Sequence, residues 1–504
     1  MRPKLYLETF GCQMNQLDSE LVLGQLHAHG YQSVEDRDQA DVILYNTCSV
    51  REHAEQKVFS RLGELRQRKA ADPGLVIGVI GCLAEQQGKS LFRKYPHVDI
   101  LCGPGELDQL VTLVHNAAVT AAGSRPPRQL ALMGAAARRS ATLAAAEDRL
   151  ELLDLSRSIS PADEVSQAYV RITRGCNKFC TYCVVPYTRG PEVHRPPQNI
   201  IDEVKKLVDG GAREVTLLGQ TINHYAYRHG DGRVTTFAQL LYQVHEAAPD
   251  LSRLRFVTSF PRDFSDEALA AMRDCRRICR YLHVPAQHGS DRILKLMNRG
   301  YAAEQYRQFL SRARAYMPDL CVASDFIVGF PTETDADFAD TLQLVQDCRF
   351  KNCFIFKYSP RPGTIAVKRL ADDVPNHVKR WRNTQLLAAQ QEISTYANRL
   401  MIGHTVEVLV EGQSKLVSKR TMPGTVELGW EKRRLDPSAP STPTTQMVGR
   451  TRGDQIVVFD APSSLKGRIV EVQIIDAKNL TLFGDLPQTS LIGDGGPLPT
   501  RVAS

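Results

Sequence analysis

Three closely spaced cysteines stand in the middle of the chain, in Arg174-Gly-Cys176-Asn-Lys-Phe-Cys180-Thr-Tyr-Cys183. Three thiolates in one tight loop can hold three irons of a [4Fe–4S] cube and leave the fourth iron without a protein ligand. An open iron is what a small chelating cofactor needs. The loop directly follows a predicted strand, and ligands bind at the carboxyl ends of parallel strands. The spacing therefore favours an iron–sulfur cluster.

Two other readings of this loop are a zinc pair and a thioredoxin-like redox motif formed by Cys180 and Cys183. Zinc requires a fourth protein ligand at short spacing, and the loop has none. Redox motifs stand at the start of a helix in a smaller fold. Both readings are less favoured than the cluster.

A second set of cysteines lies in the first part of the chain. Cys12, Cys48 and Cys82 each follow a predicted strand, in Thr9-Phe-Gly-Cys12, Asn46-Thr-Cys48 and Ile80-Gly-Cys82. Parallel strands end at one edge of a sheet, so these thiols are expected to converge into a site. The alternative is three buried structural thiols. Glycines next to Cys12 and Cys82 weigh against it, because they allow a bulky ligand close to the backbone.

The remaining cysteines are interpreted as structural. The chain has 12 in all, and in a reducing compartment that number indicates metal ligation or catalysis rather than disulfides. Those expected to pack in the core are Cys102, Cys275, Cys279, Cys321, Cys348 and Cys353.

The elements that position the cysteines suggest an α/β protein of several domains. Residues 1–117 alternate short β-rich runs (4–9, 42–45, 75–80 and 98–101) with helical patterns (16–29, 51–68 and from about 106), which predicts a small parallel sheet covered by helices. Residues 118–160 are rich in Ala, Arg and Pro and predict an interdomain linker with one short Ala-rich helix.

Residues 161–398 repeat a strand–helix unit six times, which predicts a parallel sheet curled into a partial (β/α)6 barrel. The strands are expected at 168–172, 214–218, 254–258, 281–284, 322–328 and 353–357, and a helix at 375–400 closes the domain.

Residues 399–488 predict a small β-barrel with strands at 405–410, 425–428, 455–459, 468–475 and 480–484. A Pro/Ser/Thr-rich surface loop begins at Asp436, and residues 489–504 form a tail.

The bulk composition is that of a folded, non-membrane protein. The chain has 504 residues, of which 42% are hydrophobic, and that length suggests two to four domains. No apolar run is long enough to span a bilayer, and the first residues lack an apolar signal core, so the cytoplasm is expected. The net charge of +7 fits a polyanionic partner without requiring one.

The cysteine loop at the head of a six-unit barrel resembles the radical S-adenosylmethionine superfamily. The resemblance implies that the methionine part of S-adenosylmethionine chelates the open iron and that its cleavage gives a 5′-deoxyadenosyl radical. It also implies that Tyr182 lies near the adenine. Further pocket residues at the strand ends would be Gln220, Asn223, Ser259, Gln287, His288, Gly289, Ser290, Asp325 and Gly329.

Longer motifs narrow this resemblance to the methylthiotransferase family and cover nearly the whole chain. They are Thr9-Phe-Gly-Cys-Gln-Met-Asn15, Asn46-Thr-Cys-Ser-Val-Arg-Glu52 with Ala54 and Lys57, Cys183-Val-Val-Pro-Tyr-Thr-Arg-Gly190, Ser324-Asp-Phe-Ile-Val-Gly-Phe-Pro331 and Lys357-Tyr-Ser-Pro-Arg-Pro-Gly363.

The family has an N-terminal domain with a second [4Fe–4S] cluster, a radical core and a C-terminal RNA-binding TRAM barrel. The motif around Cys48 is most similar to the branch that acts on N6-dimethylallyladenosine at position 37 of tRNA. Phe260 and His288 depart from the family pattern, which has His and Ser there.

The resemblance implies that a methylthio group replaces the C2 hydrogen of the adenine, a carbon that acid–base chemistry does not activate. Two S-adenosylmethionine molecules are expected per turnover, one for the methyl group and one for the radical. The cluster at Cys12, Cys48 and Cys82 would carry the sulfur. The expected partners are the anticodon region of tRNA, an electron donor such as reduced flavodoxin or ferredoxin, and a sulfur source. The chain is expected to be a monomer.

Three alternatives stay open at this point. A sister enzyme could act on threonylcarbamoyladenosine in tRNA or on an aspartate of a ribosomal protein. An RNA-binding iron–sulfur electron carrier is the alternative without catalysis, and it is less favoured because carriers use four protein ligands per cluster.

Overall fold

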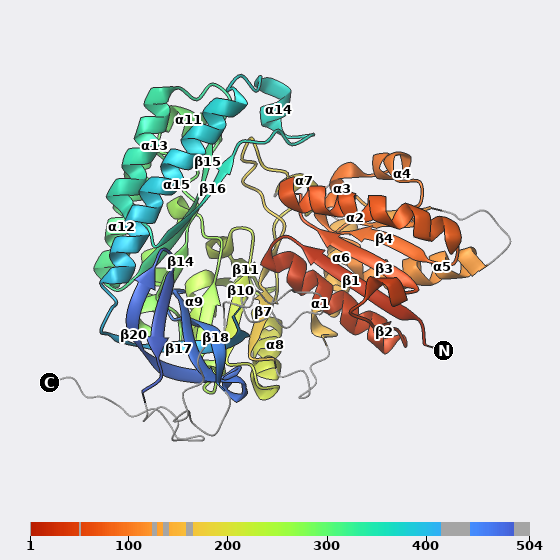
Figure 1. Cartoon of the computed structure of the whole chain (residues 1–504), viewed down its shortest axis with the longest axis horizontal. Coiled ribbons are helices and arrows are strands. Elements are labelled where there is room, and N and C mark those ends of the chain that lie inside the picture. The colour runs from red at the N-terminus through yellow and green to blue at the C-terminus, as the bar shows by residue number, and fades with distance from the viewer. Residues whose placement is uncertain are drawn as a thin grey trace, which may run out of the picture.

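The computed structural model describes residues 2–49, 52–122, 129–134, 141–157, 165–414 and 444–487. The N-terminal α/β domain, the larger α/β core and the C-terminal barrel are distinct in the fold (Figure 1). The N-terminal domain lies beside the core, and the barrel lies against one end of the core. The predicted fold class is thus confirmed.

The N-terminal domain is built on a six-stranded sheet in the order β2-β1-β3-β4-β5-β6, in which every pairing is parallel. Alternate residues of each central strand face opposite layers, so Val42 and Leu44 pack on one side and Ile43 and Tyr45 on the other. The strands are β1 (Lys4–Phe10), β2 (Gln32–Ser33), β3 (Val42–Thr47), β4 (Val76–Ile80), β5 (Ile100–Cys102) and β6 (Leu130–Leu132).

Helices cover both faces of this sheet, as a parallel sheet with two apolar faces requires. One face packs against α1 (Gln13–Ala28), α5 (Leu110–Ala122) and α6 (Ala141–Leu155). The other packs against α2 (Glu52–Ala71), α3 (Cys82–Gln87) and α4 (Ser90–Lys94).

The segment 118–160 contributes more structure than a linker. Its Ala-rich helix is present as α6, and Leu150 and Leu153 of that helix are buried in the core of the N-terminal domain. Strand β6, which was not predicted, pairs in parallel with β5 through Leu101 and Ala131. At three residues the strand is too short to give a periodic pattern. The rest of the segment, 123–128, 135–140 and 158–164, lies outside the described residues.

The core contains the six predicted strands in two parallel groups, β13-β10-β7 and β14-β15-β16. A parallel bridge between Leu254 and Ile278 lies between the groups, so the strands follow one another around an open curve. They are β7 (Gln167–Arg171), β10 (Glu214–Leu218), β13 (Arg253–Phe256), β14 (Tyr281–His283), β15 (Cys321–Val328) and β16 (Asn352–Lys357).

The helices of the core follow its strands, and the buried residues of most of these helices form one continuous core with the strands. They are α7 (Val185–Thr188), α8 (Pro197–Asp209), α9 (Phe237–Ala247), α10 (Asp266–Asp274), α11 (Asp291–Leu296), α12 (Ala303–Tyr316), α13 (Asp335–Cys348), α14 (Ile365–Arg369) and α15 (Asn376–Arg399). Two short hairpins add β8 (Thr173–Arg174) with β9 (Val193–His194) and β11 (Ala226–Arg228) with β12 (Val234–Thr236).

The C-terminal domain is a closed barrel in the order β17-β18-β19-β21-β20. Four of its strands were predicted, but β18 was missed because it follows the Pro/Ser/Thr-rich stretch. The predicted strand at 425–428, the loop from Asp436 and the tail at 489–504 lie outside the described residues. The strands are β17 (Thr405–Gln413), β18 (Thr444–Thr451), β19 (Ile456–Pro462), β20 (Ile469–Lys478) and β21 (Thr481–Asp485).

The barrel is fixed to the amino-terminal ends of the core strands. The fully buried Arg253, at the start of β13, donates to the Arg450 carbonyl at 2.7 Å and the Glu407 carbonyl at 3.0 Å. Lys351, just before β16, pairs with Asp454 at 2.8 Å. The barrel therefore covers the end of the core opposite to the carboxyl ends of its strands.

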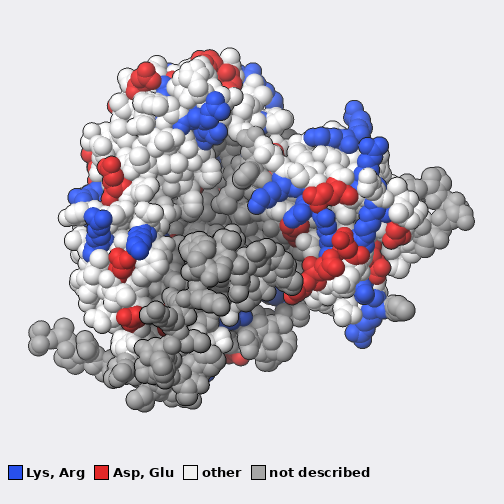
Figure 2. Space-filling model, viewed as in Figure 1, with Lys and Arg blue, Asp and Glu red and all other residues white. Residues whose placement is uncertain are grey.

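Among the described residues, no helix is long and apolar enough to cross a membrane. Figure 2 shows Lys and Arg interspersed with Asp and Glu over the N-terminal domain, so this face carries no field of a single sign.

Candidate functional site

The three cysteines of the N-terminal domain lie at one edge of its sheet, as predicted. Cys12 caps α1 after β1, Cys48 follows β3, and Cys82 begins α3 after β4. These three strands are adjacent in the sheet. The Cys48 amide donates to the Phe10 carbonyl at 3.0 Å, which aligns the ends of β1 and β3.

Cys12 differs from an ordinary buried structural thiol in its acidity. A hydrogen bond with Cys48 lowers the pKa of Cys12 to about 6, against the opposing effect of burial. Burial raises the pKa of Cys82, and Arg189 opposes that rise through its charge and a hydrogen bond. Gly11 has a φ of +139°, and a Cβ there would lie 2.5 Å from the Cys48 Cβ, so only glycine lets the two cysteines approach.

The second set, Cys176, Cys180 and Cys183, lies in the loop after β8 at the carboxyl end of the first core strand. Backbone amides of Lys178 and Val185 donate to the sulfurs of Cys176 and Cys183, each at 3.5 Å. Gly175 allows this turn, because its φ is +67° and a Cβ would lie 1.9 Å from the Pro191 carbonyl oxygen.

Cys176 and Cys183 lack the lowered pKa of a redox-active thiol. Burial raises the pKa of Cys176 and raises that of Cys183 to about 12, whereas a reactive thiol has a lowered pKa. No three His, Cys, Asp or Glu side chains of the described residues are grouped so as to hold one metal ion. A cube places each thiolate on a different iron, so its ligands stand farther apart than those of one zinc ion.

Arg299 contacts the loop that carries Cys176, Cys180 and Cys183, and no sequence pattern indicated this contact. Its guanidinium donates to the Cys180 sulfur at 3.4 Å and to the Pro285 carbonyl at 2.8 Å. The side chain is buried and lies 4.6 Å from the centroid of the Phe260 ring. Hydrogen bonds to ligand sulfurs are one means by which proteins tune an iron–sulfur cluster.

The predicted pocket residues have different surroundings. Tyr182 lines a cavity beside Cys183, and its ring packs with the apolar cluster around Ile293 and Met297. Gln220 stands two residues after the end of β10, next to Thr221, whose hydroxyl lies 3.5 Å from the Cys176 sulfur.

The other two predicted residues, Asn223 and Ser259, are both buried. Asn223 accepts from the Phe260 amide at 2.7 Å and donates to the Phe260 carbonyl at 2.9 Å, so its side chain holds the Ser259–Phe260 turn. The Ser259 hydroxyl has no hydrogen-bond partner among the described residues, which leaves it for a ligand.

The cavity has a volume of about 850 Å³, which suits a nucleotide-sized ligand. It lies between the carboxyl ends of β15 and β16, the cysteine loop and α15. Gln56 of α2 also lines it, and the Glu55–Arg361 ion pair at 2.9 Å joins the N-terminal domain to the core beside it. Its further lining includes Gln287, Asp325, Ile327, Ile355, Phe356, Lys357, Tyr358 and Lys379.

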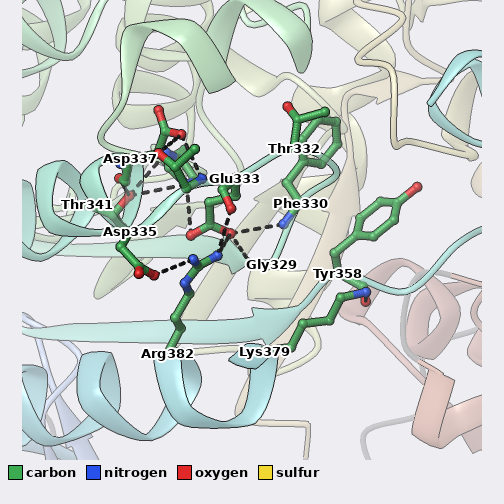
Figure 3. A network of polar contacts seen from close by, with 12 residues as sticks. Gly329, Phe330, Thr332, Glu333, Asp335, Asp337, Thr341, Tyr358, Lys379 and Arg382 are labelled. Atoms are coloured by element: carbon green, nitrogen blue, oxygen red, sulfur yellow. Dashed lines mark hydrogen bonds and ion pairs between the residues drawn. The ribbon is translucent and has the colours of Figure 1, made fainter. Parts of the chain in front are cut away.

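The loop after β15 is held by the carboxylate of Glu333, which is fully buried (Figure 3). It accepts hydrogen bonds from the amides of Gly329 and Phe330, and Arg382 of α15 lies 3.5 Å away. The side chain of Lys379 passes so close to Gly329 that a Cβ on Gly329 would lie 2.3 Å from the Lys379 Cγ. The network thus fixes the wall of the cavity against α15.

The two departures from the family pattern are accommodated locally. Phe260 takes the cations of Arg299 and Lys178 against its ring, at 4.6 and 4.7 Å from the centroid. His288 is fully buried, accepts from the Ser290 amide at 3.0 Å and lies 3.5 Å from Glu333. Gln287 and Asp325 line the cavity, whereas His288 belongs to the network behind it.

Comparison with known proteins gives matches to all three parts. Uncharacterized protein family UPF0004 matches residues 4–103, the Radical SAM superfamily matches 170–345, and the TRAM domain matches 438–486. A tRNA-2-methylthio-N(6)-dimethylallyladenosine synthase from Rhodopirellula baltica is 43% identical over 99% of this chain and 98% of its own length. The chain belongs to this synthase family.

Other members of the synthase family agree in extent. One from Porphyromonas gingivalis is 40% identical over 96% of this chain and 95% of its own length. Among solved structures, the radical S-adenosylmethionine methyltransferase TsrM from Kitasatospora setae aligns with a TM-score of 0.48 and 14% identity, over 73% of this chain and 77% of TsrM. The region matched by family UPF0004 contains Cys12, Cys48 and Cys82. The region matched by the Radical SAM superfamily contains Cys176, Cys180 and Cys183.

Proposed function

We propose that this protein adds a 2-methylthio group to N6-dimethylallyladenosine at position 37 of tRNA. The observation that carries the proposal is the pair of cysteine sets, each at the carboxyl ends of parallel strands, in a chain that aligns with a named synthase along 99% of its length. One radical centre needs one open-iron site. A second site is what a reaction that also delivers sulfur requires.

The residues fit two [4Fe–4S] clusters, one on Cys12, Cys48 and Cys82 and one on Cys176, Cys180 and Cys183. With S-adenosylmethionine on its open iron, the second cluster would supply the radical that activates the adenine C2–H bond. Side chains cannot activate that bond by acid–base chemistry. The donor sets support this: glycines make room at both sites, and Ser259 offers an unpaired buried hydroxyl. Two molecules of S-adenosylmethionine are proposed per turnover.

The side chains of the cavity would bind and orient the nucleotide. Ile327, Ile355 and Phe356 offer apolar surface suited to a prenyl group. Lys357, Arg361 and Lys379 bring positive charge for a phosphate, although Arg361 is also paired with Glu55 and Lys379 with Asp372. Tyr182 and Cys183 place this cavity directly beside the proposed radical site.

The proposed partners follow from the reaction. They are the anticodon region of tRNA, an electron donor such as reduced flavodoxin or ferredoxin, and a sulfur source, with the protein acting as a monomer in the cytoplasm. The TRAM match supports the RNA partner. The surface of the barrel that is left for RNA lies on its outer strands, because the end that faces the core is occupied by Arg253 and its partners.

The test is mass spectrometry of tRNA nucleosides from cells lacking this protein. We expect loss of 2-methylthio-N6-dimethylallyladenosine, accumulation of N6-dimethylallyladenosine, and restoration by the intact gene. Loss of the methylthio form of threonylcarbamoyladenosine, or of a modified ribosomal aspartate, would assign a sister reaction instead. When the purified protein is chemically reduced in the presence of S-adenosylmethionine, it should yield 5′-deoxyadenosine, which an electron carrier does not make.

A further inference from the structure

One arginine of the core reaches the cysteines of the N-terminal domain. Arg189 follows α7, the short helix that continues from Cys183, yet its guanidinium lies in the other domain. It donates to the Asn15 side chain at 3.1 Å and pairs with Asp18 at 2.9 Å, and its charge opposes the rise in the pKa of Cys82 that burial causes. Asn15 in turn accepts from the Cys12 thiol at 3.4 Å.

The position of this side chain is fixed at both ends. The Cys176 amide donates to the Gly190 carbonyl at 3.2 Å, so the backbone beside Arg189 is bonded to the cysteine loop of the core. At the other end Asp18 is fully buried and pairs with both Arg189 and Arg171. Because α7 packs against α3, which begins at Cys82, the same segment contacts both cysteine sets.

We propose that Arg189 is a positioning residue that holds the two cysteine sets in one arrangement and supplies the counter-charge for the cluster on Cys12, Cys48 and Cys82. The inference rests on the proposed function, which places a cluster there. Three thiolates make such a cluster an anion, and each added electron increases its negative charge. A guanidinium that is always charged, is buried from water and shares the Asn15 side chain with the Cys12 thiol stabilises the more negative state.

A single carboxylate does not cancel this charge at the site. Asp18 is shared between the guanidinium groups of Arg171 and Arg189, and Asp154, the other carboxylate bonded to Arg171, is itself shared with further arginines. Asp18 therefore does not neutralise Arg189 alone, and Arg189 contributes positive charge beside the cysteines. Neither Asp18 nor Asn15 can replace it, because a carboxylate and an amide bring no positive charge.

The test measures the midpoint reduction potential of the cluster on Cys12, Cys48 and Cys82 alone. The full-length chain is used with Cys176, Cys180 and Cys183 changed to Ala. Dithionite supplies the electrons, and electron paramagnetic resonance follows the reduced cluster. Arg189→Met should lower the equilibrium constant for reduction at least tenfold, which is about 59 mV for one electron. Arg189→Lys keeps the charge and should stay nearer the parent value.

Arg157→Met is the matched control. Arg157 is also buried and also joins the core to α1, because it pairs with Glu20 of α1 and Glu203 of α8, but the contacts of its guanidinium among the described residues are with carboxylates and a carbonyl. It should lower stability without shifting the midpoint. An unchanged midpoint in Arg189→Met, or an equal shift in Arg157→Met, would overturn the proposal. Absence of iron from the parent would instead refute the cluster itself, which separates the two failures.

Discussion

Replacing Cys12, Cys48 and Cys82 together with Ala tests whether the edge of the N-terminal sheet is a metal site. Two cubes amount to about eight irons and eight sulfides per chain, and loss of one leaves about four of each. Radical formation needs only the open iron at Cys176, Cys180 and Cys183, so 5′-deoxyadenosine should still form. Methylthio product should not, because no sulfur reaches the substrate.

The variant should remain folded, which makes the iron count meaningful. Cys48 and Cys82 are buried and Cys12 is half-buried. Removing each sulfur costs on the order of 1 kcal/mol, so about 3 kcal/mol in total, against a typical stability of about 5–15 kcal/mol. The assays are iron and sulfide determination, circular dichroism and chromatography of the nucleosides.

Cys102→Ala provides the matched control for that experiment. Cys102 lies in the same sheet, on β5, but its thiol donates to the Gly103 and Glu106 carbonyls. It should keep all eight irons. Full iron and normal product in the triple variant would refute the sheet-edge argument and leave the three residues as packing thiols.

Further predictions concern other parts of the molecule. Cys180→Ala should abolish 5′-deoxyadenosine formation, and undiminished formation would contradict the radical assignment. Arg253→Met should destabilise the core–barrel contact by about 3–5 kcal/mol, seen as a lower urea midpoint; an unchanged midpoint would show that the contact carries no energy. Burial opposes ionisation of Asp154, but Arg171 and other arginines keep its pKa well below the usual value. Its stabilisation should therefore be present above about pH 4 and lost as the pH falls further, and Asp154→Asn should show less loss between pH 5 and 2. The affinity for tRNA should fall steeply with salt, since phosphate contacts release counterions; a flat dependence would argue against binding through the backbone.

The sequence predicted the features that depend on local pattern and strand direction. Cys12, Cys48 and Cys82 follow strands whose parallel order places them at one edge, and that order follows from alternating strands and helices. The six core strands and the helix 375–400 have clear periodicity, and the structure has them within a few residues.

What escaped prediction depends on contacts between distant segments. Arg299 lies beside Cys180 although 119 residues separate them, and Arg189 reaches Asp18 across 171 residues. Neither arginine stands in a pattern that marks its partner. The expectation that Asn223 contacts a ligand stays a prediction, and the structure adds a role that the sequence did not indicate, because the Asn223 side chain bonds the Phe260 backbone at the turn after Ser259.

The attachment of the barrel to the core has a consequence for protein synthesis. Arg253 leaves the ribosome before its partners Glu407 and Arg450, which lie 154 and 197 residues later. At about 5–20 residues per second, those partners follow on the order of ten to forty seconds afterwards. Asp18 likewise waits for Arg171, 153 residues downstream. The nascent chain must therefore keep Arg253 hydrated until its last domain emerges, so the contact between core and barrel forms only near the end of translation.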